Sequence, residues 1–113
     1  MHEVSIIQNV IQMAEEQARA QGAKRIHALR MRIGAMSGVV VDALEFAFEV
    51  VRRGTMADQA ALEIETAPPR AWCAACRKEF DCSNWNLACP DCGEPSREIR
   101  KGTEVELVDM EIS

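Results

Sequence analysis

The sequence contains no tyrosine, and only 4% of its 113 residues are aromatic. A hydrophobic core therefore has to be built from Ile, Leu, Val, Met and Ala. No apolar run approaches the ~20 residues that cross a bilayer. The amino terminus also lacks a basic stretch followed by an apolar run and a small-residue cleavage site, which would mark a secretory signal. We therefore expect a cytoplasmic protein without a membrane segment.

An excess of basic residues is also lacking. Lys and Arg number 13 and Asp and Glu number 18, which gives a formal net charge of -5. Because binding to a phosphate backbone needs Lys and Arg concentrated on one surface, this balance argues against a nucleic-acid partner. No nucleophile with a positioned base and no phosphate-cradling glycine loop is visible, so the sequence does not suggest an enzyme.

Two segments have the periodicity of helices. Apolar residues recur at steps of three and four in 4–20, which predicts an amphipathic helix that ends at Gly22. A second helix is predicted after Ser37, which is a plausible N-cap. Its apolar residues within 40–51 fall on one broad face, and Gly54 marks its end.

Three segments have the pattern of strands, namely 27–33, 62–66 and 103–112. The alternation in the first strand assigns His27 to the inward side, as a hydrogen-bonded core histidine. The pattern in 103–112 changes phase, so either a bulge or a two-sided strand is expected there. Complementary charges point outward from the three strands: Arg30, Arg32, Glu63, Glu65, Glu104 and Glu106.

These elements predict an α+β fold, in which a small mixed three-stranded sheet is covered by two helices. Pairing of opposite charges across the strands would favour that sheet. The cysteine-rich segment is then an insertion between the second and third strands. We expect one domain from residues 1–66 plus 103–113 and a second from residues 67–102.

The inserted segment contains two Cys-x-x-Cys turns, in a compartment where thiols stay reduced and rarely form disulfides. Two such turns complete a tetrahedral sulfur site, so we predict a zinc ribbon with four cysteine ligands. Gly93 permits a left-handed backbone after the second turn, whereas Arg77 follows the first, so the two halves are expected to differ. A thioredoxin-type redox pair and rubredoxin-like iron are the alternatives. The predicted zinc ligands are Cys73, Cys76, Cys89 and Cys92.

Three other residues of this segment have less specific roles. Cys82 is interpreted as a small buried thiol, with an exchange ligand or redox handle as the alternative. Trp72 and Trp85 are expected to pack beside the metal loops, although Trp85 can also stack on a partner. The charges of 67–102 are nearly balanced, which favours a structural clip over a nucleic-acid reader.

The chain begins Met1-His2-Glu3. A free amine, the His2 amide nitrogen and the imidazole can chelate one ion through a five-membered and a six-membered ring. Such nitrogens suit a planar ion, Ni(II) or Cu(II), better than zinc. Glu3 can add its own amide or its carboxylate as a further donor. An ordinary surface histidine is the alternative.

Several motifs occur together here: Met1-His2-Glu3, Ile33-Gly34, Ser37-Gly38, Leu44-Glu45-Phe46-Ala47-Phe48-Glu49 and the paired Cys-x-x-Cys turns. In this combination the whole chain resembles the HypA/HybF family of hydrogenase-maturation nickel chaperones. The resemblance implies a nickel site at His2, the Met1 amine and nearby backbone amides, with structural Zn(II) on the four cysteines. The chain also departs from the family, because some members have an acidic residue soon after Ser37, where the nearest carboxylate here is Asp42.

The resemblance also implies partners and a role. The implied partners are the maturation GTPase HypB and the large subunit of a [NiFe] hydrogenase. In some bacteria the family also serves urease, so urease maturation proteins are further candidate partners. The leading hypothesis is a non-enzymatic nickel metallochaperone that delivers Ni(II) for assembly of the hydrogenase active site. The alternative is a zinc-ribbon adaptor without a second metal. The sequence leaves open whether the protein is a monomer or a homodimer.

Overall fold

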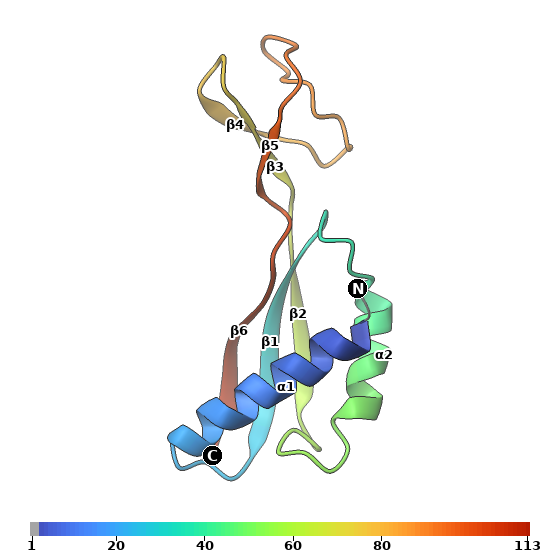
Figure 1. Cartoon of the computed structure of the whole chain (residues 1–113), viewed down its shortest axis with the longest axis vertical. Coiled ribbons are helices and arrows are strands. Elements are labelled where there is room, and N and C mark those ends of the chain that lie inside the picture. The colour runs from blue at the N-terminus through green and yellow to red at the C-terminus, as the bar shows by residue number, and fades with distance from the viewer. Residues whose placement is uncertain (1–2) are drawn as a thin grey trace. The chain divides into compact units, whose positions relative to one another are not determined.

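The computed structural model describes residues 3–113, which divide into two compact units (Figure 1). The described part of the first unit comprises 3–32, 39–65 and 106–113, and the second comprises 33–38 and 66–105. Residues 33–38 thus group with the cysteine-bearing segment, whereas the sequence places them in the first domain. The boundaries expected from the sequence stay a prediction. No helix among the described residues has both the length and the apolar character needed to span a bilayer.

Helix α1 (Glu3–Ala20) confirms the first predicted helix. Its buried face carries aliphatic side chains that recur at three- and four-residue steps, so burial of one stripe stabilises it. The helix ends where Gly22 adopts a φ of +75° and the Ala23 amide donates to the Ala18 carbonyl at 2.9 Å. The buried residues are Ile6, Ile7, Val10, Ile11, Ala14 and Ala18.

Helix α2 (Val41–Val51) begins later than the sequence predicts, and Ser37 as its N-cap is wrong. The amide of Ser37 donates to the Gly34 carbonyl at 3.0 Å, and Gly38 has a φ of +82°, so this stretch forms a turn and not the start of a helix. Val40 is the N-cap residue, and no side-chain bond caps the helix there. In Figure 1 α1 crosses β1 and β2, and it packs against α2.

The first sheet has the strand order β2-β1-β6, with β1 at Ile26–Gly34, β2 at Ala61–Ala67 and β6 at Val105–Ile112. The amide of Gly34 donates to Glu104, while the amide of Ser113 donates to Arg25, so β1 and β6 run antiparallel. Side-chain pairs between β1 and β2 instead rise together in residue number, which indicates parallel strands. The predicted mixed sheet is therefore confirmed.

Two arginines of β1 organise the outer face of this sheet. Arg30 contacts acidic groups on both neighbouring strands, and the hydrogen bonds that it donates to Asp109 and then to Glu111 raise its pKa. Each pair is exposed to solvent, so it contributes to the register of the strands more than to overall stability. The contacts are Arg30 with Glu63, Asp109 and Glu111, and Arg32 with Glu65 and Glu106.

The inward position predicted for His27 is wrong. Its side chain is exposed, and Nε2 lies 2.6 Å from Ser113 Oγ. Ala28 and Leu29 are both buried, so the alternation of the strand changes phase between them and moves His27 to the solvent side. A simple period-two pattern cannot reveal such a change.

Gly34 lies where the end of β1 approaches the backbone of Gly102, within the second unit. A Cβ on Gly34 would meet the Gly102 carbonyl oxygen at 2.0 Å, whereas a Cβ on Gly22 would meet nothing within 4 Å. The close approach therefore leaves no room for a side chain at position 34.

Substituting the two glycines tests this close approach. We expect Gly34→Ala to lower the free energy of unfolding by about 3 kcal/mol, since backbone must move. Gly22→Ala should cost only about 1–2 kcal/mol, from its left-handed φ. Urea unfolding of both variants measures the difference, and equal losses would contradict the close approach.

Candidate metal centre

The cysteine turns sit at the tips of two hairpin-like loops in the second unit. Strand β3 (Arg70–Cys73) pairs antiparallel with β4 (Lys78–Asp81) and with β5 (Glu98–Lys101). The pairing of Cys73 with Lys78 closes the first turn, and a bridge between Ala88 and Pro95 closes the second. The first cysteine turn therefore connects two strands of the sheet, and the second lies on a separate loop.

A residue with a positive φ follows the second cysteine of each turn. Arg77 has a φ of +54° and Gly93 has a φ of +77°, so the two halves differ in residue type but not in the sign of φ at this position. A non-glycine residue in this region costs roughly 1–2 kcal/mol, which the fold offsets at Arg77. The amide of Cys76 donates to Cys73 Sγ at 3.4 Å, as expected for a turn that stabilises a thiolate.

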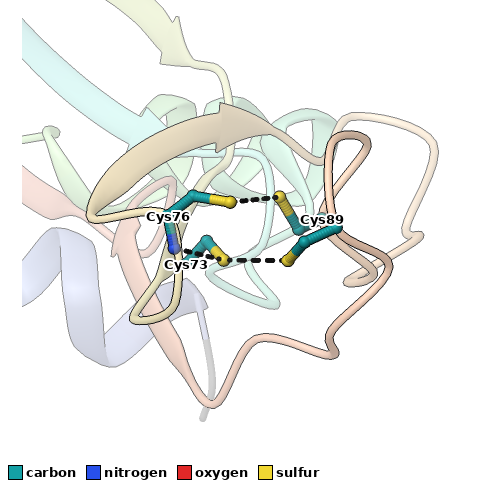
Figure 2. A group of neighbouring side chains, drawn as sticks. Cys73, Cys76 and Cys89 are labelled. Carbon is teal, nitrogen blue, oxygen red and sulfur yellow. Dashed lines mark hydrogen bonds between the residues drawn. The ribbon is translucent and has the colours of Figure 1, made fainter.

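The four sulfur atoms converge on one point. They lie within 4.8 Å of one another, and Figure 2 shows the side chains facing each other from the two turns. The Sγ atoms of Cys73 and Cys92 are 3.5 Å apart, and those of Cys76 and Cys89 are 4.0 Å apart. Four sulfurs at about 2.3 Å from a tetrahedral ion are separated by about 3.8 Å. The cluster therefore has the donor set and the dimensions for a four-coordinate metal.

The pKa values of two thiols in the cluster are shifted in opposite directions. Hydrogen bonds with Cys92 and then with Cys73, together with burial, raise the pKa of Cys76 to about 12. The backbone amide of Cys92 in contrast lowers the pKa of Cys89. Without a metal, the Cys76 thiol therefore stays protonated at neutral pH. A divalent ion reverses that preference by replacing the protons.

A very small core surrounds the cluster. Besides the clustered thiols, Met36, Leu87 and Ile99 are partly buried against it. The guanidinium carbon of Arg100 in β5 lies 4.1 Å from the Trp72 ring centroid, so the two side chains stack across neighbouring strands. Packing of Trp72 beside the metal loops stays a prediction. Trp85 is 66% exposed, so the expectation that it also packs there is wrong. The buried members of this core are Ala71, Cys73, Phe80, Cys82 and Cys89.

Cys82 is a core residue that lies outside the thiol cluster. Its side chain is 0% exposed, and it does not belong to the group of four sulfurs. Burial raises the pKa of its thiol, so it is protonated and unreactive at neutral pH. The interpretation of Cys82 as a small buried thiol is confirmed.

The predicted nickel residues Met1 and His2 lie outside the described residues. Glu3 is the first residue of α1, and its Oε2 accepts a hydrogen bond from the Val40 amide at 3.4 Å. Sequence reasoning did not find this partner, because a backbone amide carries no residue-specific signal. Asp42, the nearest carboxylate after Ser37, is exposed in the first turn of α2.

Comparisons with known proteins agree over the full length. The family model described as "Hydrogenase/urease nickel incorporation, metallochaperone, hypA" matches residues 1–112. Hydrogenase maturation factor HypA from Picosynechococcus sp. (strain ATCC 27264 / PCC 7002 / PR-6) is 46% identical, over 99% of both chains. The corresponding protein of Rhizobium leguminosarum bv. viciae is 41% identical, also over 99% of both. The solution structure of the Ni metallochaperone HypA from Helicobacter pylori has a TM-score of 0.72 at 26% identity, and covers 99% of this chain and 97% of that one.

The distinction between clustered and core thiols is testable by metal content. We expect Cys76→Ser to lose bound zinc, because three thiolates and a hydroxyl hold the ion less tightly. Cys82→Ser should keep full zinc content while lowering thermal stability, because it places a hydroxyl in an apolar core. Elemental analysis of both purified variants measures the difference. Zinc loss in Cys82→Ser without unfolding would place Cys82 in the metal site.

Because the pKa of Cys76 is raised, both the stability of the metal-free protein and its affinity for zinc should depend on pH. In the metal-free protein this thiol contributes stability below the usual thiol pKa of about 8.5, and the contribution is lost as pH rises toward 12. Metal binding has the opposite dependence, since it must release protons. We expect zinc affinity to increase steadily between about pH 6 and pH 8. Competition with a chelator measures this, and a pH-independent affinity would contradict a protonated thiol cluster.

Proposed function

Because this chain belongs to the HypA family of hydrogenase and urease nickel-incorporation metallochaperones, we propose that it binds Ni(II) at its amino terminus and delivers it for assembly of a [NiFe] hydrogenase active site. The observation that carries this proposal is the match to the family over residues 1–112, which includes the Met1-His2-Glu3 start. The family description names a nickel-incorporation metallochaperone, and the relatives are named as hydrogenase maturation factors.

The donors at the amino terminus suit nickel as cargo. The Met1 amine, the His2 amide nitrogen and the His2 imidazole supply three nitrogens, and Glu3 supplies a further donor through its amide or its carboxylate. A planar, nitrogen-rich set favours Ni(II) over Zn(II). Such a chelate can open one donor at a time, as an incoming ligand displaces the imidazole or the amine.

The thiol cluster has a different role. Cys73, Cys76, Cys89 and Cys92 would hold Zn(II), which supplies a closed tetrahedral centre and contributes directly to folding. Zinc is preferred to iron because a folding role needs no electron transfer. The two metals therefore use separate donors of different softness.

The proposed role implies specific partners. Nickel transfer in the cytoplasm would involve the maturation GTPase HypB and the large subunit of the hydrogenase, and the family description extends the role to urease. The alternative function is a zinc-ribbon adaptor that carries no second metal. The exposed Trp85 side chain favours that alternative, because an aromatic ring in solvent suits contact with a partner.

Replacing His2 tests the nickel site directly. We expect His2→Ala to reduce nickel affinity by at least tenfold, because the imidazole closes one of the two chelate rings, while zinc content stays unchanged. Isothermal titration with nickel and elemental analysis measure these two quantities. Native nickel affinity in the variant would place the site elsewhere.

Adding one residue ahead of Met1 separates the chaperone from the adaptor. The extension moves the free amine away from the imidazole, so we expect nickel binding to be lost while fold and zinc content persist. An adaptor would not respond to the extension. X-ray absorption spectroscopy on the untagged protein provides the control: nickel surrounded by nitrogen supports the proposal, and nickel surrounded by sulfur overturns it.

A further inference from the structure

One edge of the first sheet is open. In the order β2-β1-β6, strand β6 pairs with β1 on one side, and no other described strand lies on its far side (Figure 1). Ser113 and Arg25 exchange both of their backbone hydrogen bonds, at 3.0 Å each, and the direction of the amides alternates along a strand. The amides of Met110 and Ile112 therefore point away from β1. An open edge of this kind is a template for one further strand.

An apolar groove lies between α1 and β6. Met13 of α1 is 48% exposed, and it lines the groove together with Leu107 and Met110 of β6. The groove has a volume of about 310 Å³, and every residue of β6 is exposed or half-buried. Because the side chains of a strand alternate between its two faces, the apolar side chains on one face of an added strand would enter this groove and cover Met13.

The outer face of the same sheet edge is acidic. Arg30 and Arg32 of β1 contact five carboxylates between them. Three of these carboxylates belong to β6, namely Glu106, Asp109 and Glu111, and their side chains are still 49–59% exposed. Two guanidinium groups do not neutralise five carboxylates, so this face keeps a negative charge. That charge favours Lys or Arg on an adjacent strand.

We propose that β6 is a docking edge for an extended, basic segment of a partner protein, which joins the first sheet as a fourth strand. The Lys or Arg side chains of the segment lie beside the carboxylates of β6, and the apolar side chains that alternate with them fill the groove against α1. A second copy of this chain does not match the site, because it would bring a second row of carboxylates to the same face. The inference is independent of the proposed nickel site.

A synthetic peptide with the proposed pattern tests the site in the intact, zinc-loaded protein without nickel. The probe has eight residues, as β6 does, and alternates Lys with Val. We expect it to bind about tenfold more tightly than a peptide in which four Lys precede four Val, since only the alternating pattern separates charged and apolar side chains onto two faces. Fluorescence anisotropy of the labelled peptides measures both affinities. Equal affinities would mean that charge alone attracts the peptide, which overturns the proposal.

Substitution of Met110 tests the outward-pointing amide. Met110→Pro removes this donor and keeps the hydrogen bonds between β6 and β1, because the amide points toward the open edge. Met110→Ala is the matched control, since it also removes the long side chain but retains the amide. We expect Met110→Pro to bind the alternating peptide about three- to tenfold more weakly than Met110→Ala does. If the two variants fold and bind the peptide equally, the partner does not pair with β6.

Methylated peptides test the same hydrogen bonds without any change to the protein, so they decide the question even if Met110→Pro does not fold. In one peptide the Lys amides are N-methylated, and in the other the Val amides, so each peptide loses the donors of one edge. Only one edge of the bound strand faces β6. We therefore expect one peptide to lose binding and the other to keep it, and tolerance of both modifications overturns the proposal.

The chemistry of the occupant is tested through charge and through self-association. Asp109→Asn combined with Glu111→Gln should weaken binding of the alternating Lys-Val peptide about two- to tenfold, and an alternating Glu-Val peptide should not bind. Unchanged affinity in this variant would place the peptide elsewhere. Analytical ultracentrifugation tests the second copy. A dimer that Met110→Pro dissociates would show that β6 pairs with itself, which overturns the basic partner.

Discussion

The convergence of four thiols is the constraint on which the second unit depends. Its buried core consists of two small or aromatic side chains and three cysteines, too little apolar area to stabilise an independent domain. Two short loops therefore need a cross-link, and metal–thiolate bonds would supply free energy that a hydrophobic core of this size does not. The left-handed Arg77 is understandable in the same terms, because its unfavourable conformation closes the turn that brings Cys76 to the other thiols.

The two proposed sites have different tasks: the thiol cluster would hold Zn(II) permanently, whereas the amino-terminal site would release Ni(II) to a partner. Each thiol pair sits on a loop closed by backbone pairing, so an ion held by all four thiols would have to lose metal–thiolate bonds to two loops before it could leave. The proposed nickel donors instead follow one another along a single stretch of chain, so they can detach in sequence. The proposed zinc site has sulfur donors, whereas the proposed nickel site has nitrogen donors. This difference also limits exchange of the two ions between the sites, because each donor set disfavours the coordination geometry that the other ion prefers.

Much of the fold follows from periodicity and spacing. Amphipathic spacing identified α1, alternation identified β1 and β2, and the paired Cys-x-x-Cys turns identified the four cysteines that the structure brings together. The errors share a cause, which is local conformation set by tertiary contacts. Ser37 lies in a turn that a helix-cap rule does not anticipate, and His27 points outward because of a phase change within β1. Neither feature leaves a signature in residue type.

The contact between Glu3 and Val40 illustrates the same limit, because its donor is a backbone amide. Where some relatives are expected to have an acidic side chain after Ser37, this chain has valines at positions 39, 40 and 41. A backbone amide is present in every residue except proline, so this donor to Glu3 does not depend on the side chain at position 40. The structure therefore allows the side chains of this segment to vary while the carboxylate of Glu3 keeps its donor.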